Sequence, residues 1–226
     1  MTGPDGSVTL NVVVRLSLPL SQRSDWVKVF DPMSGDLFVP IATPPDAGTD
    51  VRIDLTVSKG GPRVILRGQV QWSRADGDPK NPAGCSVSLA TTEREKINFL
   101  NGYVRGGILN RREKRRLPLR LPVTFGGLSG PVETHTRDIN DEGIFIVTDS
   151  PLPEGTIVHF VVVPPAHAPL EIKGVVSHTV LVTDEDVPGM GIRYTLDAAR
   201  QEEVTAVVDE LEAAFLAGTL PEEVLM

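Results

Sequence analysis

The sequence predicts an all-β protein that contains two copies of one domain, each followed by a C-terminal α-helix. Three observations support this prediction. Apolar and polar residues alternate through most of the chain, which is typical of strands with one buried face. Gly and Pro are frequent, with 21 and 19 residues among 226, and they divide the pattern into short segments. A stretch of the first half also aligns without a gap on a stretch of the second half.

The alternation predicts the strands in order along the chain. In residues 8–18 every second residue is Val or Leu, and residues 51–57 ("VRIDLTV") continue the pattern. A third strand is expected in residues 63–72 ("RVILRGQVQW"). In the second half, Pro, Gly or Asp bound four further strand-like segments, "GIFIV", "TIVHFVVV", "LEIKGVV" and "MGIRYTL".

Two segments have helical spacing instead. One follows Thr92, where "TERE" offers a capping box ahead of Ile97 and Leu100. The other begins near Asp197, a suitable N-cap, and Gly218 stands where a C′ glycine would end the helix. The apolar residues of this second helix recur at helical spacing: Val204, Val207, Val208, Leu211 and Phe215.

The two halves of the chain share a repeat. Residues 36–51 align on residues 143–158, with Phe38 on Phe145. The strings "RGQVQW" and "KGVVSH" match farther along, and each copy then reaches its helix. Because one register holds across several strands, the pattern indicates a duplicated domain.

Composition excludes several classes of protein. The chain carries 22 Lys and Arg against 30 Asp and Glu, and its net charge of −8 argues against wholesale binding to nucleic acid or an anionic membrane. The single cysteine, Cys85, allows no intrachain disulfide. Neither a secretory signal nor an apolar run of about 20 residues is found, so we expect a cytoplasmic protein with no membrane span.

Catalytic and metal-binding patterns are not found either. The sequence has no GxSxG, no P-loop and no paired catalytic carboxylates. Its histidines are scattered without metal-ligand spacing: His135, His159, His167 and His178. We therefore expect no enzymatic activity, no metal and no cofactor.

Residues 111–116 ("RREKRR") gather five cations in six positions of this acidic chain. A charge run between two domains is often a solvated linker. This one is rich in Arg, whose planar guanidinium binds phosphate and the guanine edge in a bidentate manner. It also leads directly into a strand, and the turn-rich segment "RDINDEG" (137–143) lies downstream. The pattern leaves open both a linker role and an anion-binding role.

With these two segments, the second half of the chain resembles the PilZ domain family. Arg112 and Arg116 match the family's RxxxR motif ahead of the first barrel strand. Asp138, Asn140 and Gly143 match its [D/N]xSxxG motif, with Asn in place of Ser. The segments "GIFI", "LPEGT" and "GMGIRY" follow the family's layout as well.

The resemblance covers about residues 110–217 and implies a six-stranded β-barrel followed by a helix. By the repeat, we expect two tandem PilZ-like barrels. The expected division is a degenerate PilZ-like domain at 1–104, a basic linker at 105–116 and a PilZ domain with its helix at 117–226.

The resemblance further implies binding of cyclic di-GMP, a bacterial second messenger. In the family's pattern Arg112 and Arg116 would bind its phosphates and guanines, and Arg111 would favour a stacked pair of ligand molecules. Asp138 would accept a hydrogen bond from a guanine N–H edge. Gly143 would let the backbone approach the ligand closely.

Asn140 leaves two roles open. Its side chain either preserves a hydrogen bond to the ligand in place of Ser or closes an Asx-type turn. In the first half, the aligned positions of Asn140 and Gly143 are Met33 and Asp36, and no RxxxR motif precedes the first strand. We therefore expect the first domain to bind no nucleotide and to offer a surface for a protein partner.

The sequence thus predicts a receptor or adaptor that reports cyclic di-GMP occupancy to a protein partner through ordering of the linker and reorientation of the domains. The first alternative is a protein-interaction module that acts without nucleotide. The second is a nucleic-acid binder that uses the basic cluster, against which the net charge and the lack of an aromatic platform argue.

Overall fold

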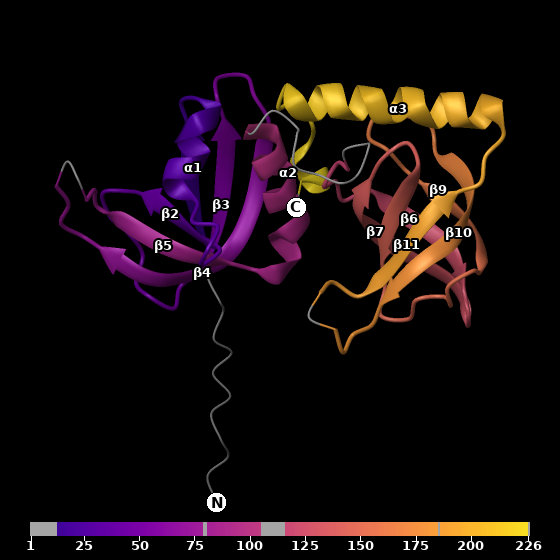
Figure 1. Cartoon of the computed structure of the whole chain (residues 1–226), viewed down its shortest axis with the longest axis horizontal. Coiled ribbons are helices and arrows are strands. Elements are labelled where there is room, and N and C mark those ends of the chain that lie inside the picture. Colours follow the sequence, from indigo (N-terminus) through magenta and orange to yellow (C-terminus); the bar gives the residue numbers. More distant parts are fainter. Residues whose placement is uncertain (1–12, 79–80, 105–115, 185, 226) are drawn as a thin grey trace, which may run out of the picture.

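The computed structural model describes residues 13–78, 81–104, 116–184 and 186–225 (Figure 1). The N-terminal part consists of β1 (Val14–Leu20), η1 (Arg23–Asp25), α1 (Trp26–Val29), β2 (Asp36–Pro40), β3 (Asp50–Val57), β4 (Arg63–Arg74), β5 (Gly84–Leu89), η2 (Thr91–Glu93) and α2 (Arg94–Val104). The C-terminal part consists of β6 (Pro122–Gly127), β7 (Gly130–Ile139), β8 (Gly143–Val147), β9 (Ile157–Val162), β10 (Leu170–Val180), β11 (Gly189–Tyr194), α3 (Ala198–Leu216) and η3 (Glu222–Val224).

The C-terminal part is a closed barrel, as predicted. Its six strands follow the order β10-β11-β8-β7-β6-β9, and β9 pairs again with β10. All neighbouring pairs are antiparallel. The inward residues are the apolar positions of the alternating pattern, and α3 follows the last strand.

The N-terminal part is a mainly β unit too, but the prediction of a second closed barrel is wrong. Its five strands form an open sheet in the order β1-β3-β4-β5-β2. By the repeat, β2 to β5 correspond to β8 to β11. β1 lies beside β3 as β6 lies beside β9, but β1 runs parallel to β3 whereas β6 runs antiparallel to β9. No second strand lies between β1 and β2 to close the sheet, because the residues between them form η1 and α1. Without that strand β1 and β2 are left as the two ends of the sheet.

The two sheets nevertheless share local geometry. Gly48 N donates to Val70 O over 2.8 Å in the first sheet, and Gly155 N donates to Val176 O over 2.8 Å in the second. The ring of Phe38 lies 5.8 Å from that of Trp72. In the aligned place of the barrel, the rings of Phe145 and His178 are 5.9 Å apart. These matches support the duplication read from the sequence.

The long helix α3 begins and ends where the sequence predicts. Asp197 Oδ1 accepts a hydrogen bond from Arg200 N over 2.8 Å, and Gly218 follows the helix with a φ of 66°. The expected capping box at Thr92 does not form, because a 3-10 turn precedes α2 and Ala90 stands at its N-cap without a side-chain bond.

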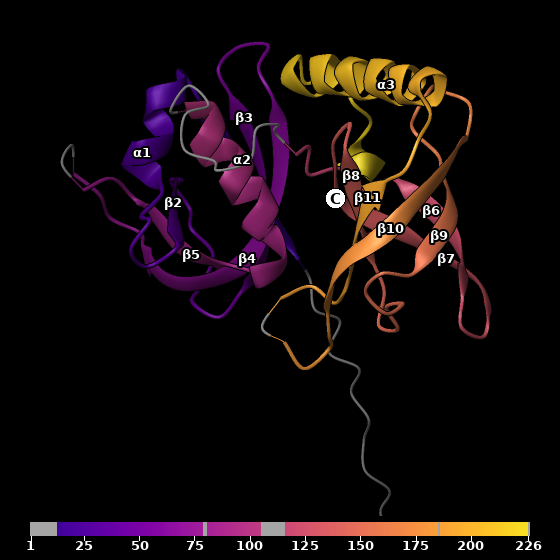
Figure 2. The same cartoon turned by 45° about the vertical axis from the view of Figure 1, so that its right-hand side comes forward.

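Helix α3 also reaches the first domain (Figures 1 and 2). The buried ring of Phe215 packs edge-on against Phe99 of α2, with centroids 4.8 Å apart. Beyond the helix, Glu222 pairs with Arg52 of β3 over 2.6 Å. The two parts of the chain therefore share an apolar contact and an ion pair. None of the helices described is both long and apolar enough to cross a membrane.

Candidate functional site

A buried carboxylate lies at the centre of the candidate site. Asp138, near the end of β7, has no exposed side-chain surface. Its Oδ1 accepts from Arg116 Nη1 over 2.7 Å, and its Oδ2 accepts from Arg137 Nε over 2.9 Å. Hydrogen bonds between charged partners are stronger than neutral ones, and a buried carboxylate needs them because burial removes its water.

Backbone pairing explains how Arg116 reaches Asp138 across 22 positions of the sequence. Leu117 N donates to Ile139 O over 2.8 Å, and Ile139 N donates back to Leu117 O over 3.0 Å. This isolated bridge fixes the segment that ends the basic cluster against the end of β7. Of the predicted arginines, Arg116 is thus placed beside the second motif, whereas Arg111 and Arg112 lie outside the described residues.

Arg137 is a member of this cluster that the sequence did not reveal. Neighbouring residues of a regular strand point to opposite faces, so Arg137 was not expected to contact Asp138. The pairing of β7 with β8 shifts register between Thr136 and Asp138, which marks a β-bulge and relaxes that rule. The only signal in the sequence was the direct adjacency of the two residues in "RDIN".

Arg137 also connects the cluster to the first domain. Its guanidinium carbon lies 3.7 Å from the ring centroid of Phe145, a cation–π arrangement that fixes its position. Its Nη2 atom is 3.9 Å from Glu95 Oε1 on α2. Its Nη1 atom is 3.7 Å from Asp186 Oδ1, and Asp186 in turn pairs with Arg94 of α2 over 3.0 Å. One arginine therefore contacts the buried carboxylate and the domain interface together.

The second motif forms a tight turn. Asn140 Oδ1 accepts from Gly143 N over 2.8 Å and from Glu142 N over 3.1 Å. Asn140 N donates to Gly143 O over 2.9 Å. Of the two roles left open for Asn140, the Asx-type turn is therefore present. A side chain at Gly143 would place its Cβ atom 2.5 Å from Ile192 O, so close packing of β8 against β11 already requires glycine there.

Two buried polar atoms near Asp138 have no hydrogen-bond partner among the described residues, Arg116 Nε and Tyr194 Oη. Burial raises the pKa of Tyr194 above its usual range; Arg116 lowers it, whereas Asp138 and Asp141 raise it further. The phenol is therefore neutral at pH 7. A buried polar group without a partner costs about 1–3 kcal/mol, so a water or a ligand that bonds to either atom would stabilise this region.

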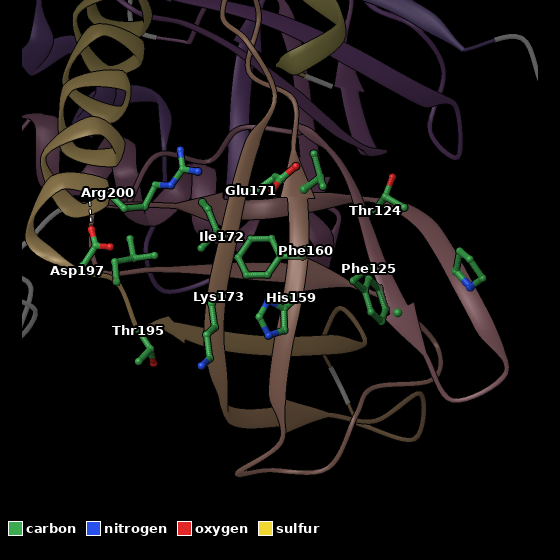
Figure 3. Close-up of a pocket in the computed structure, with 14 residues that line it drawn as sticks. Thr124, Phe125, His159, Phe160, Glu171, Ile172, Lys173, Thr195, Asp197 and Arg200 are labelled. Carbon is green, nitrogen blue, oxygen red and sulfur yellow. Dashed lines mark hydrogen bonds between the residues drawn. The ribbon is translucent and has the colours of Figure 1, made fainter.

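A separate groove opens on the outside of the barrel (Figure 3). Its cavity of about 550 Å³ lies between β6, β9, β10 and the start of α3. Lys173 and Arg200 line it together with Glu171 and Asp197, so its formal charges balance. None of its residues belongs to the two motifs. Such a groove is less suited than the arginine cluster to a ligand with two phosphates.

Metal binding has no support in the described part of the chain, where no three His, Cys, Asp or Glu side chains are grouped to hold an ion. Cys85 is fully buried on β5, and burial raises the pKa of its thiol. It is a small core residue, as its isolation in the sequence indicates.

The family model described as PilZ domain matches residues 110–210. No curated protein matches the sequence.

Several solved structures are similar in fold. YcgR from Escherichia coli in complex with c-di-GMP has 10% identity and a TM-score of 0.40, over 85% of this chain and 71% of that one. The MrkH–c-di-GMP complex of K. pneumonia has 12% identity and a TM-score of 0.39, over 79% and 76%. The Bacillus subtilis inhibitor of motility (MotI/DgrA) has 14% identity and a TM-score of 0.39, over 81% and 80%.

The cluster predicts a specific order of stability losses. Asp138→Asn leaves Arg116 and Arg137 without their shared buried anion, so the free energy of unfolding should fall by about 3–5 kcal/mol. Arg116→Ala should cost less, because Arg137 still pairs with Asp138. Urea denaturation measures both losses. The control Asp209→Asn, on the exposed face of α3, should change stability by about 0.5 kcal/mol or less. If Asp138→Asn is as mild as this control, the carboxylate does not hold the cluster together.

Proposed function

We propose that this chain, whose residues 110–210 form a PilZ domain, is a receptor for cyclic di-GMP that passes ligand occupancy to a protein partner. The observation that carries the proposal is the ion pair of Arg116 with buried Asp138, which joins the two motifs at one end of the barrel. PilZ proteins are generally receptors without catalytic activity, and we propose no enzymatic role here.

The chemistry of the cluster suits this ligand. Cyclic di-GMP carries two phosphates and two guanines, and Arg can bind either group in a bidentate manner. The Arg116 side chain is 18% exposed; Asp138 holds its Nη1 atom, and its Nε atom is buried without a hydrogen-bond partner among the described residues. In this proposal Arg111 and Arg112 supply the remaining positive charge, and Arg111 favours a stacked ligand pair.

Asp138 is proposed to act first by orienting Arg116. Its carboxylate is fully buried and engaged at both oxygens, so it can accept from a guanine edge only after Arg137 leaves Oδ2. Asn140 Oδ1 is occupied within the turn, which leaves its Nδ2 group as the donor for a ligand. These constraints favour recognition mainly through arginine.

Transmission to the first domain is proposed to pass through Arg137. A ligand phosphate that competes for Arg116 weakens its bond to Asp138 and leaves more of that carboxylate to Arg137. Arg137 would then lose its long contact with Glu95 on α2, and the domains would change their orientation. The first domain, an open sheet without the motifs, is proposed as the surface for the partner.

Direct binding tests the ligand. In a calorimetric titration the full chain should bind cyclic di-GMP with a micromolar or lower Kd, and GTP or GMP much more weakly. Arg116→Ala should weaken binding by about tenfold or more, because it removes a charge-assisted contact. Arg74→Ala is the matched control, since Arg74 lies over Trp72 in the first domain. No heat with wild-type protein at high ligand concentration would contradict the receptor proposal.

Small-angle scattering tests the change in domain orientation. Saturating cyclic di-GMP should alter the distance distribution of the wild type. Arg112→Ala should show no change because binding is lost. Arg137→Ala should still bind yet show a reduced change, since the connection to Glu95 is removed. If saturating ligand leaves the scattering curve of the wild type unchanged, the domains do not reorient. That result would not contradict ligand binding itself.

The alternative is a PilZ-like interaction module that acts without nucleotide, and the commitment of Asn140 Oδ1 to the turn favours it. Asn140→Ser distinguishes the two. A serine can accept from the same turn amides and restores the family's residue, so an intact receptor should keep or gain affinity for cyclic di-GMP. If only the Asn140→Ser variant binds cyclic di-GMP, the natural chain has lost the ability to bind this ligand.

A further inference from the structure

A second cluster of cations surrounds a cavity between the two domains. The cavity measures about 170 Å³ and takes side chains from both parts of the chain. We call it the interface pocket and define it by Arg67, Thr92, Glu93, Lys96, Arg120 and His135. Arg67 comes from β4 and Arg120 from the segment before β6, so the two arginines approach from different domains. Among the cavity's lining residues, only Arg137 also belongs to the Asp138 cluster.

Positive charge in the interface pocket exceeds negative charge. Glu93 is its one carboxylate. The Glu93 side chain is 1% exposed, and its Oε2 atom forms an ion pair with Lys96 Nζ over 2.6 Å. Lys96 Nζ also donates to Ile65 O over 2.7 Å. Within the described ranges neither Arg67 nor Arg120 has a carboxylate within ion-pair distance. The formal sum over Arg67, Lys96, Arg120 and Glu93 is therefore two positive charges.

The cations are close enough to affect one another. Burial lowers the pKa of Lys96, the pair with Glu93 raises it, and Arg67 and Arg120 lower it further. Burial also lowers the pKa of His135, and Arg120 adds to this shift. An acidic protein with a net charge of −8 thus maintains a local repulsion between its domains. An anion in the cavity would relieve it.

We propose that the interface pocket binds a small oxyanion of the phosphate type, contacted by Arg67 and Arg120. Guanidinium groups bind phosphate oxygens in pairs, and the Thr92 hydroxyl and Lys96 ammonium supply further donors. Whole-ligand pockets usually measure about 300–1,000 Å³, so this smaller cavity suits a phosphate group rather than an entire nucleotide. Because its arginines belong to different domains, the bound anion stabilises the domain interface. This site does not depend on cyclic di-GMP binding.

Thermal unfolding of the full chain in inorganic phosphate tests the site, with chloride at equal ionic strength as the reference. At about ten times its Kd, phosphate should raise the Tm of the wild type by about 3–5 °C. Arg67→Gln and Arg120→Gln should each need about tenfold more phosphate for the same rise. In chloride these variants should be as stable as the wild type or more stable, since each removes repulsion. Arg74→Gln and Arg116→Ala should respond to phosphate as the wild type does.

A second measurement uses the wild type alone. In the phosphorus-31 NMR spectrum, the line of inorganic phosphate should broaden when the protein is added and sharpen again when sulfate competes. This result does not depend on whether the variants fold. Titration with GMP separates two sources of the anion. If half of the full rise in Tm is reached at a GMP concentration about tenfold below that of phosphate, the site binds the phosphate group of a nucleotide. If the two concentrations are equal, the site binds free phosphate. An identical phosphate effect in all variants, or no effect and no broadening in the wild type, would overturn the proposal.

Discussion

The buried carboxylate of Asp138 is the constraint on which the rest of the site depends. A carboxylate without solvent contact needs cations or hydrogen-bond donors nearby, and here two arginines supply both. One of them, Arg116, ends the basic cluster that precedes the barrel. The other, Arg137, reaches Glu95 of the first domain. The same anion therefore positions the candidate ligand-binding arginine and joins it to the domain interface, so neither arginine can move without changing the environment of the other.

The first domain has neither the two motifs nor the full set of barrel strands. Asp138 lies on β7, and the N-terminal sheet has no strand in that place. Met33 and Asp36, aligned with the motif positions, follow α1 instead, and Met33 N donates to Asp31 in a turn. The first domain therefore has no strand in the place that holds Asp138 in the barrel, beyond the substitution of its motif residues. Its sheet also stays open, which is the form in which a sheet can still accept contacts from another chain.

Much of this could be read from the sequence, and the exceptions have physical causes. Alternation located β1, β3, β4 and β8 to β11, and Asp197 and Gly218 marked the ends of α3. The open N-terminal sheet was not predicted because the gap-free alignment begins at residue 36, after the segment that would have to supply the sixth strand. The contact of Arg137 with Asp138 was not predicted because a β-bulge changes which side chains share a face. The interface pocket was not predicted because Arg67 and Arg120 come together only when the two domains pack, and no local sequence pattern encodes that packing.

The central claim is that cyclic di-GMP binds at the cluster around Asp138, and hydrogen exchange tests it most directly. Exchange of the full chain, read by mass spectrometry with and without saturating ligand, resolves separate peptides. We expect slower exchange in peptides covering residues 110–117 and 138–143, where the Asn140 turn amides lie, and a smaller change in the α2 peptide that contains Glu95. Protection confined to the groove lined by Lys173 and Arg200, or no protection in any peptide, would contradict the claim.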